Sequence, residues 1–180
     1  MPPFGGANAR VLVVGLAPGL HGANRTGRPF TGDHAGELLY ATLRDFGLAS
    51  GDYAARVDDG LRLKDTAILN AVRCVPPQNK PSPAEIATCR AFLSAALADM
   101  PALEVVVALG RVAHESVVRA CGRRLAAFPF AHGAEHAITA AARPVRLIDS
   151  YHCSRYNTNT GVLTPAMFQA VFARVRALLG

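Results

Sequence analysis

The stretch Arg10-Val11-Leu12-Val13-Val14, closed by Gly15, decides the fold of this chain. A short apolar run without polar alternation is typical of a strand buried on both faces of a parallel sheet. Three further runs have this character, at residues 66–72, 104–109 and 145–148. Helical patterns alternate with them, at residues 34–46, 82–98, 111–120 and from 164 to the end. This order predicts an α/β fold: a single three-layer domain, residues 1–180, with a four-stranded, mostly parallel sheet flanked by helices.

The composition agrees with one folded domain. Of the 180 residues, 51% are hydrophobic and 18% are charged, which is the opposite of the balance that keeps chains disordered. No uncharged apolar run approaches the ~20 residues that span a membrane, and the first residues lack the pattern of a secretory signal. We therefore expect a cytoplasmic protein that has no membrane partner.

The charge favours an anionic partner. Nineteen Lys and Arg residues against thirteen Asp and Glu residues leave a net charge of +6. Such a balance suits nucleic acid, but it is equally compatible with an ordinary basic protein.

Two long loops stand at the carboxyl ends of the predicted strands, where parallel α/β folds bind ligands. The first, residues 15–33, reads G-L-A-P-G-L-H-G-A-N-R-T-G-R-P-F-T-G-D and far exceeds the usual ~2–6 residues. It lacks the dinucleotide-binding and triphosphate-binding glycine patterns. The last loop, residues 150–161, reads S-Y-H-C-S-R-Y-N-T-N-T-G and is almost wholly polar. Long ordered loops at this edge are usually functional.

These loops resemble those of the uracil-DNA glycosylase superfamily, with family 5, or B-type, enzymes as the best match. The resemblance is carried by residues 15–33, N-A-V-R-C-V-P-P-Q-N-K-P-S-P-A-E (70–85), A-L-G-R-V-A (108–113) and S-Y-H-C-S-R-Y-N-T-N-T-G-V-L-T (150–164). It implies a monomeric enzyme of base excision repair. Such an enzyme flips uracil out of DNA and hydrolyses its N-glycosidic bond, leaving an abasic site.

The resemblance also implies catalytic roles. The backbone of Leu16 and Ala17 faces the base carbonyl. Many relatives carry a water-activating Asp or Asn where this chain has Ala17, and Asp33 is the carboxylate that the B-type family offers instead, to orient water or balance the sugar cation. The alternative is that Asp33 only caps the following helix. His152 donates to the base oxygen that becomes negative, with a structural hydrogen bond as its alternative.

Recognition of the base and of DNA is implied in the same way. Phe30 stacks on the flipped base, or is an ordinary core aromatic; Asn70 pairs with the uracil edge, or is a buried amide bound to local backbone. Gly19 stands where uracil-specific relatives carry a bulky tyrosine. The open space predicts a pocket that also admits hypoxanthine, xanthine or 5-substituted uracil. The minor groove of DNA receives four neighbouring residues, with Arg155 or Tyr156 filling the gap left by the base: Ser154, Arg155, Tyr156 and Asn157.

The family normally holds a four-iron, four-sulfur cluster through four cysteines. Cys74 and Cys89 match two of them, and the other two belong to a segment before the first strand that this sequence does not contain. Cys121 and Cys153 are not placed to substitute. Because two thiolates do not hold such a cluster firmly, we expect no metal and no cofactor. A cluster-free variant and a start set too far downstream remain equal explanations.

Two other functions stay open. A lesion-binding DNA protein with little or no turnover would explain the absence of a carboxylate at Ala17. An enzyme acting on free nucleosides would use the same pocket, although Arg155 and the net charge of +6 argue against it. Of the remaining histidines, His34, His114 and His136 are expected on the surface.

Overall fold

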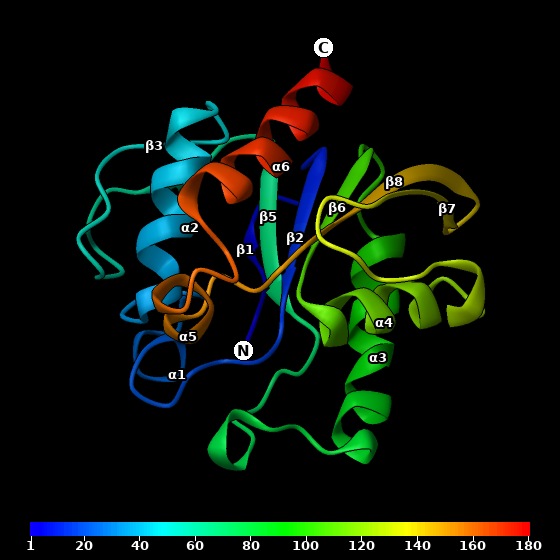
Figure 1. Ribbon diagram of the computed structural model, residues 1–180, viewed down its shortest axis with the longest axis horizontal. Helices are drawn as coiled ribbons and strands as arrows, with labels where there is room; N and C mark the ends of the chain where they lie inside the picture. Colours follow the sequence, from blue (N-terminus) through cyan, green and yellow to red (C-terminus); the bar gives the residue numbers. More distant parts are fainter.

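The computed structural model describes all 180 residues and has a six-stranded sheet in the order β1-β5-β2-β6-β8-β7 (Figure 1). Its four central strands run parallel: β5 (Thr66–Asn70), β2 (Val11–Gly15), β6 (Val105–Leu109) and β8 (Arg143–Ser150). The edges are the antiparallel strands β1 (Phe4–Gly5) and β7 (Glu135–Ala140). The predicted α/β class is confirmed, whereas the predicted count of four strands was wrong because it omitted both edges.

The long helices begin where the sequence places local start signals. The Ser82 hydroxyl accepts a hydrogen bond from the Glu85 amide, and the Glu85 carboxylate accepts one from the Ser82 amide, so this capping box opens α3 (Pro83–Ala98). At the start of the last helix, Thr164 accepts a single hydrogen bond from the Met167 amide, without the reciprocal bond of a capping box. The remaining elements are α1 (Ala23–Thr26), α2 (His34–Asp45), the hairpin β3 (Ala49–Ser50) and β4 (Arg62–Leu63), α4 (Arg111–Ala120), α5 (Arg155–Asn159), α6 (Pro165–Leu179), and single turns at Pro77–Asn79 and Leu125–Ala127.

The helices cover the sheet on both faces. Because neighbouring residues of a strand point to opposite faces, Val11 and Val13 enter one core and Leu12 and Val14 enter the other. The first core contains buried residues of α2 and α6, and the second contains buried residues of α3 and α4. The result is the three-layer arrangement expected from the sequence.

This topology brings the polar loops together. The carboxyl ends of the parallel strands β2, β5 and β8 lie at the same end of the sheet, and the loops that follow these strands meet there. His34, the first residue of α2, contacts Thr158 of α5 through Nε2 and Oγ1 at 3.2 Å. The first and last long loops are therefore side by side at this end of the molecule. None of the helices combines the length and the apolar character needed to cross a membrane.

Candidate active site

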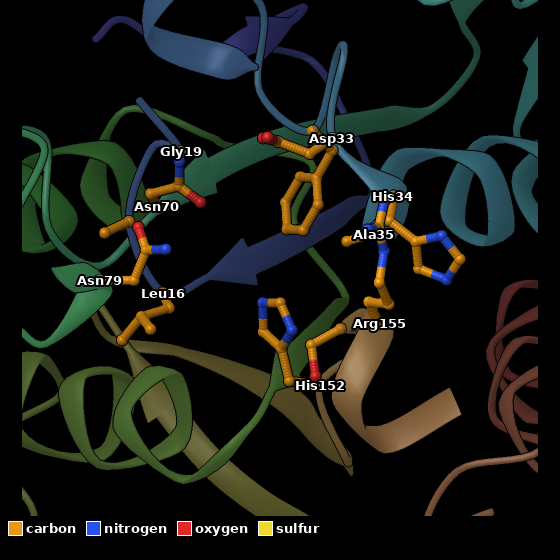
Figure 2. Close-up of a pocket in the computed structure, with 12 residues that line it drawn as sticks. Leu16, Gly19, Asp33, His34, Ala35, Asn70, Asn79, His152 and Arg155 are labelled. Atoms are coloured by element: carbon orange, nitrogen blue, oxygen red, sulfur yellow. The ribbon is translucent and has the colours of Figure 1, made fainter. Parts of the chain in front are cut away.

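A cavity of about 530 Å³ opens at the carboxyl ends of the central strands (Figure 2). Nine of the residues singled out from the sequence line it: Leu16, Ala17, Gly19, Phe30, Asp33, Asn70, His152, Ser154 and Arg155. Three lining residues had no assigned role: His34, Ala35 and Asn79. His34 was expected on the surface. His34 and Ala35 are the first residues of the helix that follows Asp33, and this adjacency could have indicated that both lie near the cavity. Asn79 lies in a turn whose shape the sequence does not reveal.

Phe30 forms an apolar wall of the cavity. Its side chain is buried and its backbone is left-handed, with φ of 56°, a conformation that strains a bulky residue. The Tyr53 hydroxyl holds this backbone by donating to the Phe30 carbonyl at 3.1 Å. A Cβ at Gly15 would lie 2.5 Å from the Phe30 ring, so glycine there allows the ring to approach the end of β2. The glycine that ends the strand thus allows a residue of the cavity wall to take its position.

Asp33 occupies the residue before α2, but its carboxylate does not cap that helix. Oδ2 accepts instead from the Ala23 amide, at 3.3 Å. Burial raises the pKa of Asp33, and this single bond and nearby His21 oppose the shift only in part. The helix-cap interpretation therefore does not account for the carboxylate.

The carboxylate fills the space beside two glycines. A Cβ at Gly19 would lie 2.6 Å from Asp33 Oδ1, and one at Gly22 would lie closer still. The space at Gly19, expected from the sequence to be open for a larger base, is therefore taken by Asp33. Both glycines are required for the carboxylate to reach its position.

His152 follows the end of β8 and lines the cavity (Figure 2), where its ring is near that of Phe30. The two ring centroids are 6.1 Å apart with an interplanar angle of 30°. Burial lowers the pKa of His152 to about 4, so the imidazole is neutral at pH 7. Neither ring nitrogen has a hydrogen-bond partner within the protein, whereas the backbone carbonyl accepts from Asn157 Nδ2 at 2.8 Å. A neutral ring with a free N–H therefore faces the cavity.

Asn70 ends β5 at the cavity wall. Its side chain is 8% exposed, and Oδ1 is buried without a hydrogen-bond partner. A buried carbonyl oxygen left in this state costs about 1–3 kcal/mol. The alternative of an amide satisfied by local backbone is thus not what the structure contains, and Asn70 is left available to a bound molecule.

The last loop divides into supporting and exposed residues. Ser154 accepts from the Asn157 amide at 3.3 Å, and Asn157 in turn bonds the His152 carbonyl, so both hold the loop in shape. Arg155 lines the cavity, and Tyr156 is 73% exposed. The two residues expected to fill the gap in DNA are the two that reach outward.

The cysteines do not assemble the donor set of an iron–sulfur cluster. Cys74 is exposed and Cys89 is buried, and the Cys89 sulfur accepts a hydrogen bond from the Arg73 amide at 3.5 Å. Cys153 lies elsewhere and is fully buried, which raises the pKa of its thiol to about 12. Two thiols alone do not supply the four ligands that such a cluster requires, and the residues present therefore do not fit the group by themselves.

The fold and this cavity define a base-excising glycosylase, and the chain belongs to the uracil DNA glycosylase superfamily, whose family model matches residues 2–176. Within the superfamily, type-5 uracil-DNA glycosylases match the whole chain at 41–46% identity, which confirms the family predicted from the loops. It is 46% identical to the type-5 enzyme of Thermus thermophilus, over all of this chain and 80% of that relative. It is 41% identical to the type-5 enzyme of Pyrobaculum aerophilum, over all of this chain and 76% of that relative. A type-4 uracil-DNA glycosylase of Thermotoga maritima is 38% identical over 61% of this chain and 49% of its own length.

Proposed function

We propose that this protein is a DNA repair glycosylase that flips uracil out of DNA and hydrolyses the bond between base and sugar, leaving an abasic site. Its relatives of 41–46% identity are named for this activity. The observation that carries the proposal is a cavity of about 530 Å³, within the size range of small-ligand sites. One stacking ring, Phe30, and two unpaired polar side chains, Asn70 and His152, line it.

Recognition of uracil follows from these three residues. The Phe30 ring offers a face on which a flipped base can stack, and the Asn70 amide can accept from the base N–H and donate to the neighbouring carbonyl. Flipping costs a few kcal/mol of lost stacking, which these contacts offset. They also satisfy the Asn70 oxygen, which has no partner within the protein.

The chemical step divides between His152 and Asp33. As the bond from the sugar to the base nitrogen breaks, its electron pair leaves with the base, and the sugar becomes oxocarbenium-like. The neutral His152 N–H stabilises the negative base oxygen. Asp33 orients a water molecule whose oxygen bonds to the sugar carbon, and the water proton passes to the carboxylate. The raised pKa of Asp33 suits this role, since a general base works best with a pKa nearer the operating pH.

The DNA contact is proposed for the exposed part of the last loop. Arg155 lies at the cavity and can bind a phosphate, and the exposed Tyr156 can fill the gap that the base leaves. Ser154 and Asn157 keep these residues in position. We propose that residues 1–180 act as one glycosylase domain and as a monomer, in the cytoplasm where genomic DNA is the substrate.

The substrate range is proposed to include hypoxanthine, xanthine and 5-substituted uracil. The cavity volume of about 530 Å³ supports this range, whereas the space at Gly19 is occupied by Asp33. We also propose that Cys74 and Cys89 bind no cluster on their own. The purified chain is then colourless, and double replacement of these cysteines by serine leaves excision unchanged.

The experiment that tests the proposal is incubation with uracil-containing duplex DNA, followed by alkali. We expect strand cleavage at the uracil position and none in the same duplex carrying thymine. A duplex that is shifted in a gel but stays intact would instead support a lesion-binding protein without turnover. Cleavage of free deoxyuridine but not of DNA would support the nucleoside enzyme.

A further inference from the structure

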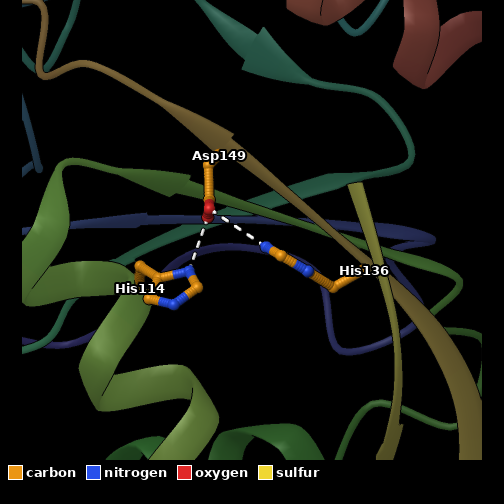
Figure 3. A group of neighbouring side chains, drawn as sticks. All are labelled: His114, His136 and Asp149. Atoms are coloured by element: carbon orange, nitrogen blue, oxygen red, sulfur yellow. Dashed lines mark hydrogen bonds and ion pairs between the residues drawn. The ribbon is translucent and has the colours of Figure 1, made fainter. Parts of the chain in front are cut away.

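Three residues distant in the sequence converge on the sheet face that α3 and α4 cover (Figure 3). They are His114 of α4, His136 of β7 and Asp149 of β8, with side chains 1%, 13% and 0% exposed. His114 Nδ1 lies 2.7 Å from Asp149 Oδ1, and His136 Nε2 lies 3.4 Å from Asp149 Oδ2. Both histidines were expected on the surface, and the structure shows that expectation to be wrong.

The hydrogen bonds of His114 leave an electrostatic conflict. His114 Nε2 lies 2.8 Å from the Phe128 carbonyl oxygen, which can only accept, so this nitrogen carries the ring proton. In a neutral ring, Nδ1 then carries a lone pair. That lone pair faces a carboxylate oxygen 2.7 Å away, which also has no proton to give. Only a cation between the two atoms makes this contact attractive.

Two further atoms of the cluster are poorly bonded. His136 Nε2 and Asp149 Oδ2 are both buried and face each other at 3.4 Å, outside hydrogen-bond geometry. Leaving a carboxylate oxygen buried and unpaired is costly. A proton between His114 and Asp149 would resolve the first contact and would leave His136 Nε2 and Asp149 Oδ2 joined only by their long contact of 3.4 Å, whereas a metal ion can bind all three side chains.

We propose that His114 Nδ1, His136 Nε2 and the Asp149 carboxylate bind a divalent transition-metal cation of the Zn²⁺ type. The three donor atoms lie within 4.8 Å of one another. Tetrahedral zinc with bonds of ~2.0–2.2 Å places its ligand atoms about 3.3–3.6 Å apart. His136 Nε2 and Asp149 Oδ2, at 3.4 Å, already have this separation, and His114 Nδ1 and Asp149 Oδ1, at 2.7 Å, must move slightly apart to bind the ion. Two imidazoles and one carboxylate suit such borderline cations, and the bond from His114 to the Phe128 carbonyl is the usual support of a ligating histidine.

This site differs from the cavity and from the cysteines. It joins α4, β7 and β8 on the face opposite α2 and α6. Three protein ligands leave one coordination position for water or an exogenous ligand, and His136, the most exposed of the three, marks the way in. The site does not depend on the proposed glycosylase activity.

The test uses the full chain, freed of metal with a chelator and titrated with Co²⁺. We expect one Co²⁺ per chain, with visible absorption of nitrogen and oxygen ligation, displacement by Zn²⁺, and a higher Tm. His136→Gln and Asp149→Asn should each weaken binding by at least ~100-fold, since loss of a mere supporting partner already costs ~10–100-fold. His132→Gln, a nearby histidine outside the cluster, should bind as the native chain does.

A Cys74→Ser, Cys89→Ser double variant separates this site from the thiols and should keep full binding. If the folded native chain took up no Co²⁺, the shared cation would be a proton and the proposal would be overturned. Binding that survived in both His136→Gln and Asp149→Asn, with circular dichroism showing intact folds, would overturn it equally. Binding lost in the double cysteine variant would assign the metal to the thiols.

Discussion

Asp33 and Asp59 are two acids that contact the same long loop in opposite ways. Asp59 binds Arg28 through both oxygens, at 2.9 and 2.7 Å, and its side chain is 0% exposed. It also accepts from the amides of Ala54 and Leu61, at 3.0 and 3.1 Å. Asp33 accepts a single bond of 3.3 Å from a backbone amide.

The difference in pairing shifts the pKa values of the two carboxyl groups in opposite directions. The Arg28 guanidinium holds the pKa of Asp59 far below its usual range, whereas burial raises the pKa of Asp33. Asp59 is therefore locked in its ionised, fully bonded form, and its role is to hold the loop. Asp33 is half-buried with free lone pairs beside a cavity, the state that a proton acceptor needs.

Asp33→Asn should give the largest effect in this comparison. The change keeps the shape of the side chain but removes the base, so the single-turnover rate of uracil excision should fall by ~10²–10⁴-fold. Affinity for uracil-containing DNA should change little, because the loop that contacts DNA is intact. A variant that excised uracil at the native rate would make Asp33 structural and would remove the distinction from Asp59.

Asp59→Asn should act on stability. It leaves the buried Arg28 guanidinium without its counter-charge, and breaking a buried pair in this way costs about 3–5 kcal/mol. Denaturant unfolding measures the loss, with Asp33→Asn as the matched control that should not be destabilised. If Asp59→Asn had the same free energy of unfolding as the native chain, the ion pair of Asp59 would contribute no more to stability than the single hydrogen bond of Asp33.

The His152 imidazole, which has no hydrogen-bond partner in the protein, extends the comparison to a basic side chain. Its contribution to stability depends on pH. Its pKa is lowered from 6.5 to about 4 in the folded protein, so the unfolded chain takes up a proton that the native state refuses. Its contribution to stability is present above pH 6.5 and is lost as the pH falls through 4, by about 3 kcal/mol in total. The difference in unfolding free energy between the native chain and His152→Gln, followed from pH 7 to 4, measures it. A difference that stayed constant would contradict the burial of the ring.

Arg155→Ala should give the smallest effect. One lost phosphate contact weakens DNA binding at every sequence and lowers the slope of affinity against salt by about 1. Binding titrations at several salt concentrations measure this slope. Arg62→Ala, an exposed arginine of β4, is the matched control and should leave it unchanged. Equal behaviour of the two variants would argue against Arg155 as the phosphate contact.

The central strands and long helices could be predicted because their signals are local. An apolar run such as residues 10–14 or a capping box at Ser82 is complete within a few positions. The edges could not be predicted in this way: β1 has two residues, and β7 is only half buried. Their strand character depends on pairing with β5 and β8 rather than on their own sequence.

The candidate site divides along the same line. The loop motifs placed nine lining residues at the cavity, but their pairing depends on neighbours far along the chain. No local sequence pattern near Asp59 predicts its ion pair with Arg28. Likewise, no spacing in the sequence predicts that His114 and His136 lie next to Asp149. Asn79 lines the cavity because it and the residue before it have left-handed backbone conformations. The polar side chains of these two residues do not reveal that conformation in the sequence.

The close approach of Gly19 and Gly22 to Asp33 also restricts how this loop can evolve. Any side chain at either glycine must displace the carboxylate, so the acid and the two glycines are sterically coupled. A substitution at Gly19 or Gly22 that keeps Asp33 should therefore be costlier than the same substitution made together with removal of the carboxylate. The effects of changes at these positions are expected to be non-additive.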